Sequence, residues 1–591
     1  MRSTEPDGVP LPWHARVRDA ATDRILGAGV LVGTRHVLTC AHVVGDPENE
    51  VVVEFTTRPE ATTTGRVEPD HWIPEGKAGE GDIALLRLAE DQPEGCGAVL
   101  RRQATPLATE VHALGFPQGH PDGLWVSMRL AGNCGPRGEW VQLNDWRPGE
   151  PSRGFSGAAV LNMLNDHVTG HVIGHVIGMV VGRHNGPPAN LAYMIPVETV
   201  ARYLPRTRRW VHGPGAVDPE TASDYDPLVP DVALAQRMTD WLRAPSTVRV
   251  LVGDGPGQTR TLRSVIVSSD REHRPPDRVL VSAPPGTVSP IASLDLAVNA
   301  SGKTVEAISQ RILDRLGIPG PASGAAGRVR DGVPAMTIVV YGIDEADDPV
   351  SLVDTLLRPL AEQRSRLLLV FGRDPSPALT RARSLESEAA TAEREHVLRL
   401  LDELTGRVAK LGVAERRAVE HWREVAPRVA GVPDPPDLAA AFLLRLLRHP
   451  GTAPEEHWTA RELQELLRRQ ERAATRIEEY GRSLREALAR RNELRGRLET
   501  SKALAVDADL AEDIDLGRLY DEAHRLLWTE RPCDVGEAAT LVRRYETAVR
   551  RLRTAGRGAA PEARGREARD RAAEERVANG GGAGDGAGGG G

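Results

Sequence analysis

The sequence predicts a multidomain protein in which an all-β domain comes first, an α/β domain second and an α-helical region last. Short apolar runs separated by Gly and Pro turns fill residues 1–212. A buried-strand run, a glycine-rich loop and a helical pattern follow from Val248, and Ala, Leu, Glu and Arg dominate after residue 378. The length of 591 residues agrees with several domains, because single cores stop growing beyond about 250–300 residues.

Composition excludes some classes of partner. The net charge is −8, so the chain offers no basic surface for nucleic acid. It has no apolar leader and no apolar run of about 18 residues, so we expect no membrane association. Four scattered cysteines show neither metal-ligand spacing nor a disulfide framework. A reducing cytoplasm is the simplest location for such a chain.

The first domain reads as a series of short strands. Apolar runs of strand length occur at 30–32, 36–39, 83–88, 172–181 and 193–197. Glycine-containing turns separate several of them, as at Gly33. This pattern is typical of a β-barrel or a β-sandwich.

Three motifs of this domain supply a histidine, an aspartate and a serine in that order. They are TCAH, GDIALL and GFSG, which contain His42, Asp82 and Ser156. A serine hydroxyl needs a neighbouring base before it attacks, and an imidazole has a suitable pKa near neutrality. A carboxylate then orients the imidazole and stabilises its cation. We therefore assign Ser156 as nucleophile, His42 as general base and then acid, and Asp82 as the orienting residue.

A tetrahedral intermediate also needs donors for its oxyanion. The backbone amides of Gly154 and Ser156 are the natural pair, because a serine flanked by glycines presents its amides in a tight turn. Taken singly, the motifs are more typical of a structural His, a turn Asp and a plain Gly-Ser turn than of a catalytic site. The three together, in order, favour the catalytic interpretation.

The segments TCAHVV, GDIALLRL and GFSGAAV resemble the trypsin-like serine proteases of the chymotrypsin fold. AYMIPVETV is similar to the end of bacterial high-temperature-requirement proteases. The resemblance implies two packed β-barrels with the three catalytic residues in the cleft between them. It also implies hydrolysis of peptide bonds through an acyl-enzyme, for which no cofactor is required.

The chain departs from this family at several positions. Phe155 stands where the digestive members have an Asp that pairs with a newly cut N-terminus, so activation by N-terminal cleavage is not expected. The disulfide that the family has beside the catalytic His is missing. The resemblance implies that Glu150 lies at the base of the specificity pocket, where an acid would favour Lys or Arg. The resemblance implies that substrate would pair with the backbone of Val180, Val181 and Gly182.

Three other histidines suggest a metal site, but only weakly. His167, His171 and His175 recur at four-residue spacing, and alternate strand residues share a face. No Cys or carboxylate cluster lies nearby in sequence, so we expect no metal site.

Residues 236–377 look like a damaged nucleotide switch. After the strand 248–252, the loop carries Gly257 and then Arg260 and Thr261, where a phosphate-binding loop needs Lys and a Mg²⁺-binding hydroxyl. Asp344 and Glu345 follow a second strand, where such a pair holds Mg²⁺ and polarises water. The motif GIDEA is similar to the GLDEA of STAND-type signalling NTPases, which implies a degenerate P-loop module.

Two hypotheses follow for this module. It binds ATP or GTP with Mg²⁺ without hydrolysing it, or it binds none and serves as a structural or sensory platform. The missing lysine favours weak or absent hydrolysis, and it argues against an active unfolding machine. The triplet 302–304 (Gly-Lys-Thr) has no glycine five residues earlier and begins an ordinary amphipathic helix.

Residues 378–555 are predicted to be helical or coiled-coil. Leucine, alanine and isoleucine recur near heptad spacing between Leu463 and Leu498, which suits an antiparallel hairpin or a short coiled coil. An intramolecular bundle is favoured over a dimer zipper, and a signalling protein is the expected partner. The tail at 556–591 is charged and then almost all Gly, so we expect disorder.

The predicted organisation is a trypsin-like domain at 1–212, a linker at 213–235, a degenerate P-loop-like domain at 236–377, the helical region and the tail. It is similar to bacterial proteases fused to signalling NTPase modules, which implies a role in stress or phage defence. The first hypothesis is a cytoplasmic serine endopeptidase that cuts protein or peptide substrates and is gated by the C-terminal modules. The alternative is a catalytically silent scaffold or sensor that uses the protease fold to bind peptides.

Overall fold

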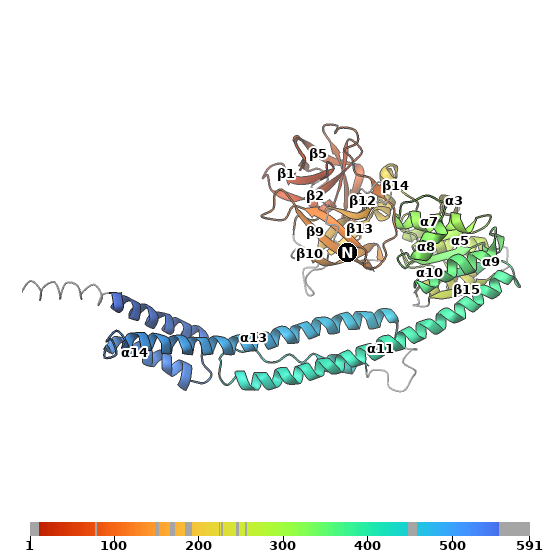
Figure 1. The fold of residues 1–591 in the computed structure, drawn as a ribbon. Coiled ribbons are helices and arrows are strands. Elements are labelled where there is room, and N and C mark those ends of the chain that lie inside the picture. Colours follow the sequence, from red (N-terminus) through yellow and green to blue (C-terminus); the bar gives the residue numbers. More distant parts are fainter. Residues whose placement is uncertain are drawn as a thin grey trace, which may run out of the picture. The chain divides into compact units, whose positions relative to one another are not determined.

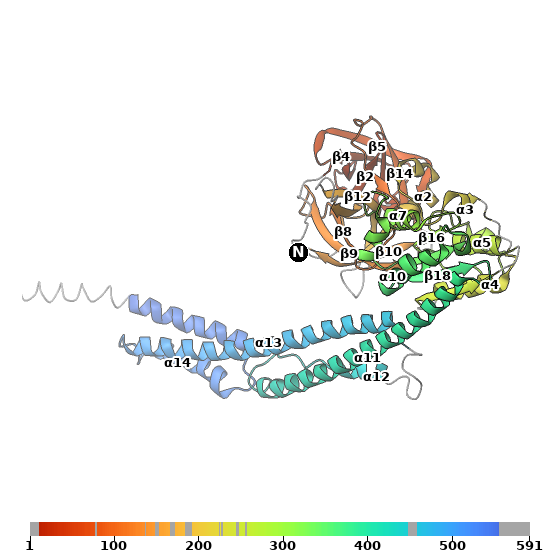
Figure 2. The same ribbon diagram turned by 45° about the vertical axis from the view of Figure 1, so that its right-hand side comes forward.

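Two β-barrels, a parallel α/β sheet and a set of long helices make up the computed structural model (Figures 1 and 2). It describes residues 11–76, 80–135, 138–147, 153–165, 172–183, 192–223, 225, 229–243, 247–253, 257–446 and 458–554. The chain forms two compact units, Met1–Arg394 and Glu395–Gly591. Glu150, His167, His171, most of the loop after residue 253 and the Gly-rich tail lie outside the described residues.

The first barrel closes through six antiparallel strands in the order β1-β2-β3-β6-β5-β4. These are β1 (His14–Asp19), β2 (Ile25–Val32), β3 (His36–Thr39), β4 (Glu50–Phe55), β5 (Arg58–Ile73) and β6 (Ile83–Leu88). A single helical turn, α1 (Ala41–Val44), follows β3. In β6 every residue except Arg87 is buried, as the apolar run in the sequence predicts.

The second barrel also closes through six strands. Its strand order is β11-β8-β9-β10-β13-β12, and the pairing of β11 with β12 completes the ring. The strands are β8 (Glu110–Gly115), β9 (Leu124–Cys134), β10 (Trp140–Arg147), β11 (Ala159–Asn165), β12 (Val172–Arg183) and β13 (Ala192–Pro196), with β7 (Leu100–Arg101) and β14 (Val211–His212) added at one edge. Helices α2 (Val197–Tyr203) and η2 (Pro205–Trp210) follow β13. The expected double barrel is confirmed.

The α/β part contains a four-stranded parallel sheet in the order β15-β18-β17-β16. Alternate strand residues enter two different apolar clusters, one on each face, so helices cover both faces of the sheet. The predicted linker includes α3 and the start of α4. The elements are α3 (Pro219–Ser223), α4 (Val232–Arg243), β15 (Val248–Val252), α5 (Gln258–Ser269), α6 (Asp277–Leu280), β16 (Leu296–Asn299), α7 (Val305–Leu316), α8 (Ala325–Asp331), β17 (Thr337–Tyr341), η3 (Ile343–Glu345), α9 (Pro349–Leu352), η4 (Val353–Leu357), α10 (Arg358–Glu362) and β18 (Arg366–Phe371).

The second unit is helical, as predicted. Its elements are the greater part of α11 (Pro377–Val425), α12 (Ala439–Leu446), α13 (Ala460–Val506), α14 (Ile514–His524), η6 (Arg525–Thr529) and a last helix over 535–554. Two long helices, α11 and α13, lie side by side (Figures 1 and 2). Early α11 residues pack with early α13 residues, and later ones with later ones. α11 and α13 are therefore parallel and do not form the expected antiparallel hairpin, because the segment between them returns along their length. The hydrogen bonds from Tyr520 to Glu499 and from Arg491 to the Leu527 carbonyl oxygen show that α14 and η6 run antiparallel to α13.

Membrane-spanning helices are absent from the described part of the chain, where no helix is both long and apolar enough.

Candidate active site

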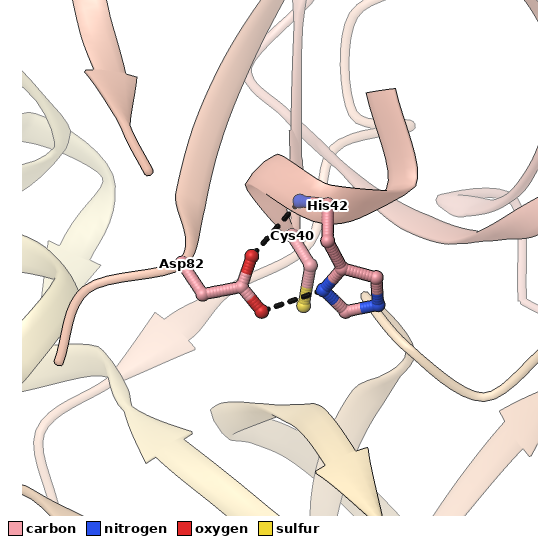
Figure 3. Close-up of side chains that lie close together, drawn as sticks. All are labelled: Cys40, His42 and Asp82. Atoms are coloured by element: carbon pink, nitrogen blue, oxygen red, sulfur yellow. Dashed lines mark hydrogen bonds and ion pairs between the residues drawn. The ribbon is translucent and has the colours of Figure 1, made fainter. Parts of the chain in front are cut away.

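His42 and Asp82 meet because the register of β3 and β6 aligns the segments that carry them. Thr39, the last residue of β3, pairs with Ala84 of β6. His42 lies one turn beyond β3, in α1, and Asp82 immediately precedes β6. The His42 ring Nδ1 lies 2.6 Å from Asp82 Oδ2, and the His42 backbone amide donates to Asp82 Oδ1 at 2.9 Å (Figure 3). Both carboxylate oxygens therefore hold one histidine.

The backbone before β6 is bent sharply to aim this carboxylate. Asp82 has φ +63° and Gly81 has φ +84°, both in the left-handed region. A Cβ on Gly81 would lie 2.7 Å from the carbonyl oxygen of Pro74, so only glycine fits there. Left-handed Asp costs energy that persists only where surroundings enforce it, and such residues cluster at functional sites.

The two side chains of the pair differ in exposure, which sets the chemistry of the histidine. The side chain of His42 is 45% exposed and that of Asp82 is 3% exposed. Burial by itself lowers the pKa of His42, but the hydrogen bond and the charge of Asp82 outweigh it and raise that pKa above its usual value. The imidazole is thus a stronger base than a free histidine, and its Nε2 edge remains open to a reacting partner.

The loop that carries Ser156 is held by glycines on both sides. Gly154 has φ +106° and Gly157 has φ +85°. A Cβ on Gly154 would clash with the backbone of Phe116, and one on Gly157 would clash with the carbonyl oxygen of Ala28. Both positions therefore need glycine, as the GFSG motif predicts.

This loop of the second barrel is fixed to the first barrel beside His42. The carbonyl oxygen of Ser156 accepts a hydrogen bond from the Ala28 amide at 2.8 Å. The Gly157 amide donates to the carbonyl oxygen of Val180 at 2.9 Å, and Cys40, two residues before His42, lies against the same carbonyl at 3.4 Å. The structure thus brings together the loops of all three predicted catalytic residues.

Two features of the loop that carries Ser156 concern its predicted role as nucleophile. Within the described ranges, neither the Gly154 amide nor the Ser156 amide donates to a protein acceptor, so both are available to an oxyanion. No hydrogen bond joins the Ser156 hydroxyl to His42 among the residues described. Catalytic hydrogen bonds are often long in free enzymes and tighten when substrate binds.

Phe155 packs in the core of the second barrel instead of pairing with a terminus. Its side chain is 2% exposed and its ring meets the Trp146 ring edge-on at 4.8 Å. Gly115 lies directly beneath the Phe155 ring, where a Cβ would collide with it. Apolar packing therefore anchors this nucleophile loop where the digestive enzymes use a charge. The sequence showed that Phe155 replaces the charged residue of the digestive enzymes, but it did not show that the Phe155 ring packs in the core.

The predicted substrate-binding residues fall on β12. Val180 and Val181 are each 2% exposed, and Gly182, at φ +53°, faces open space. The carbonyl oxygen of Val180 is occupied by Gly157, so of the three only Gly182 is exposed to an incoming strand. Glu150 is outside the described residues.

Cys40 lies beside the His42–Asp82 pair, a position that the sequence analysis did not predict. Its sulfur, the His42 ring and the Asp82 carboxylate lie within 4.8 Å of one another (Figure 3). Burial, followed by the charge of Asp82, raises the pKa of the Cys40 thiol well above its usual value, so it stays protonated. A protonated thiol is a poor metal ligand, and Asp82 already holds His42. The cluster therefore fits a histidine–aspartate pair better than a metal centre.

Of the three clustered histidines, His175 lies within the described residues. It is on β12 and is half-buried, and burial followed by the charge of Arg101 lowers its pKa to about 4.

The predicted nucleotide residues are engaged in internal hydrogen bonds. Thr261 is fully buried, and its hydroxyl accepts from the Asp231 amide at 3.1 Å. Asp344 accepts from the Gly372 amide at 2.8 Å and from the Ser376 hydroxyl at 2.9 Å.

The other members of that predicted site are more open. Glu345 accepts from the Ser301 hydroxyl at 2.8 Å. Gly257 is the N-cap residue of α5, and Arg260 is exposed on the first turn of that helix. The loop and α5 follow β15, in a strand–loop–helix arrangement.

A double barrel with a histidine–aspartate pair beside a glycine-flanked serine defines a class of hydrolase fold, and a family comparison identifies it. Residues 27–174 match the family model of the trypsin-like peptidase domain. The N-terminal part of this chain is therefore a trypsin-like peptidase domain. A comparison with curated proteins found no match.

Similar solved structures include three proteases. The M. tuberculosis Rv3671c protease in its inactive form is 19% identical, with 33% of this chain and 88% of that chain covered and a TM-score of 0.25. Mouse neuropsin is 16% identical, with 34% and 96% covered and a TM-score of 0.27. A serine endoprotease from Yersinia pestis is 18% identical, with 34% and 64% covered and a TM-score of 0.26.

Proposed function

We propose that this protein is a serine endopeptidase that cuts protein or peptide substrates through an acyl-enzyme. The observation that carries the proposal is the 2.6 Å contact between His42 and the buried Asp82, beside the Ser156 loop. A buried carboxylate that binds Nδ1 leaves Nε2 as the basic nitrogen, which is the tautomer a serine nucleophile needs.

The steps follow from these atoms. Ser156 Oγ attacks the substrate carbonyl carbon while His42 Nε2 takes the hydroxyl proton, and the oxyanion forms between the Gly154 and Ser156 amides. His42 then gives that proton to the departing amine as the carbon–nitrogen bond breaks, which leaves an acyl ester on Ser156. Water then attacks the acyl carbon while His42 Nε2 takes its proton, and His42 returns that proton to Ser156 Oγ as the bond between the acyl carbon and Oγ breaks, which releases the acid product and restores the enzyme.

The test is covalent labelling of the purified full chain with a fluorophosphonate probe. We expect labelling that is lost in Ser156→Ala, because only an activated serine reacts. Ser127→Ala is the matched control: the Ser127 hydroxyl lies 3.1 Å from His112 Nδ1, a serine–histidine contact in the second barrel outside the proposed site. Labelling lost in the control and kept in Ser156→Ala would refute the assignment.

A peptide-binding scaffold is the second candidate. The observation that favours it is the absence, among the residues described, of a hydrogen bond between Ser156 and His42. A scaffold would bind peptides with equal affinity before and after Ser156→Ala and would never label. Labelling of the wild-type chain excludes it.

The specificity proposed for the enzyme is cleavage after Lys or Arg, set by Glu150. A peptide library read with the wild-type chain and with Glu150→Gln tests it. Loss of the basic preference in the variant is the expected result, and an unchanged preference contradicts it.

The α/β and helical parts are proposed to gate the peptidase as a signalling module. The strand–loop–helix arrangement of β15 and α5 supports a degenerate phosphate-binding layout. The hydrogen bonds on Thr261 and Asp344 support a platform that does not hydrolyse nucleotide. We expect no Mg²⁺-dependent ATP turnover by the full chain, and a labelling rate that changes when cell lysate or ATP supplies the signal. An unchanged rate with every addition removes the gate.

We also propose a cytoplasmic location, with a signalling protein as partner of the helical region and a role in stress or phage defence. The four unpaired cysteines support the location. Cell fractionation with a tagged full chain tests it.

A further inference from the structure

The peptidase domain supplies hydrogen-bond donors to the C-terminal end of α7, a helix of the α/β part. A helix leaves its last carbonyl groups without intrahelical partners. The carbonyl oxygen of Arg315 accepts from the Ala104 amide at 2.8 Å, and that of Leu316 accepts from the Gln103 side chain, also at 2.8 Å. Both donors lie between β7 and β8, in the connection between the two barrels. The barrel connection therefore caps this helix.

The Arg315 side chain continues from the same helix end into the peptidase domain. Its guanidinium forms an ion pair with Glu198 at 2.7 Å, in which the side chains are 6% and 3% exposed. Arg315 Nε also donates to the carbonyl oxygen of Asp295 at 2.9 Å, which fixes the guanidinium on the α/β side. Neither partner of a buried ion pair can leave without stranding a charge, so this contact holds the two domains in one arrangement.

Glu198 is connected to the loop of Ser156 through α2, β13 and β12. It is the second residue of α2, which begins directly after β13. On β13, Met194 pairs with Val180 of β12. The Val180 carbonyl oxygen accepts from the Gly157 amide at 2.9 Å, and Gly157 follows Ser156. Two strands thus separate the ion pair from the catalytic loop.

Strands β12 and β13 pack too closely to move independently of each other. A Cβ on Gly178 of β12 would lie 2.5 Å from the Met194 side chain and 2.6 Å from the Ile195 carbonyl oxygen of β13. Strands this close shift together, because packed interiors transmit displacement.

We propose that Arg315 is a positioning residue of the peptidase: through Glu198 it holds α2 and β13, and so the β12 carbonyl that fixes the loop of Ser156. The catalytic part of this inference rests on the proposed function, whereas the mechanical part does not. The α/β domain is then a built-in support of the active site, and a change that moves α7 reaches the nucleophile.

Hydrogen exchange of the full chain tests the mechanical part. In Arg315→Met, we expect the backbone around Gly157 to exchange about tenfold faster, because local opening becomes easier once the support is lost. The matched control is Arg311→Met, one turn earlier on α7, whose partners Asp218 (3.0 Å) and Gly215 (2.7 Å) belong to the α/β side. It should leave exchange around Gly157 unchanged. Unchanged exchange there in Arg315→Met overturns the proposal.

Two further variants keep the test decisive if Arg315→Met does not fold. Glu198→Gln keeps the shape and an acceptor oxygen but removes the charge, so exchange around Gly157 should rise by a smaller factor. Arg315→Lys keeps the positive charge and should restore most of the protection. Wild-type exchange around Gly157 in Glu198→Gln overturns the proposal.

Labelling separates the two claims. For the fluorophosphonate probe, Arg315→Met should lower the maximal labelling rate and leave the half-saturating probe concentration unchanged, because the loop and not the binding surface has moved. A purely structural role would reduce the amount of folded protein and leave the rate per folded molecule unchanged. Absence of labelling in the wild-type chain would refute the proposed function, and the exchange data would still decide the role of Arg315.

Discussion

Replacing Asp82 with Asn should lower the labelling rate of Ser156 about 10⁴-fold, which corresponds to about 5 kcal/mol of activation free energy. The structure supplies the reason. Asp82 Oδ1 accepts from the His42 backbone amide at 2.9 Å, and an amide oxygen can keep that bond. The amide NH₂ then faces His42 Nδ1, which must give up its proton to accept. The proton moves to Nε2, and the imidazole can no longer take the proton of Ser156.

The pH profile should move in a defined direction. His42 must be neutral to act as a base, so the labelling rate of the wild-type chain should rise with pH through a midpoint above the usual histidine pKa of about 6.5. In Asp82→Asn the hydrogen bond and charge that raise this pKa are lost while burial remains, so the midpoint should move to lower pH.

The free energy of unfolding should also depend on pH because the pKa of His42 is raised. The pKa of His42 is higher in the folded chain than in the unfolded chain, so protonation of His42 favours folding. This contribution is complete below the unfolded pKa of about 6.5 and is lost as the pH rises through the folded pKa. Because the His42 side chain is 45% exposed, solvent screening keeps the contribution small. Asp82→Asn should flatten this part of the profile.

The assay is probe labelling across pH, with urea unfolding of the same samples. A rate in Asp82→Asn within about tenfold of the wild-type rate would refute the tautomer argument. So would a midpoint that stays in place.

Three other predictions concern the loop and its neighbours. Phe155→Ala should cost about 3–5 kcal/mol in urea unfolding because the ring is 2% exposed, and a cost below about 1 kcal/mol would contradict the anchoring role. Gly157→Ala should lower the melting temperature more than Gly182→Ala: both have positive φ, but only Gly157 lacks space for a Cβ. Equal shifts would show that contact to be unimportant. Cys40 should resist a water-soluble disulfide reagent in the folded chain while the partly exposed Cys96 reacts, as peptide mapping would show; modification of native Cys40 would contradict its burial.

Much of the candidate site was predictable because its signals are local. A glycine-flanked serine, an Asp before an apolar strand and a His after one each encode a turn at the end of a strand. The strands themselves follow from runs of buried residues, as in β6. What joins the two residues of the pair is the β3–β6 register, which the sequence does not state directly.

In the helical region, local patterns predict the helices but not their relative direction. Heptad spacing between Leu463 and Leu498 predicted helical structure, and these residues lie in the single helix α13. Its direction relative to α11 depends on the path of the chain between them, and periodicity is the same for parallel and antiparallel neighbours.

The sequence alone predicted the double barrel, the helical second unit and three candidate catalytic residues, since periodicity and turn chemistry act over a few neighbouring residues. Only the tertiary structure decided that Phe155 anchors the nucleophile loop, that Cys40 lies beside Asp82 and that Arg315 reaches Glu198. These contacts join residues that are distant along the chain. Their energies depend on burial, which no local pattern specifies.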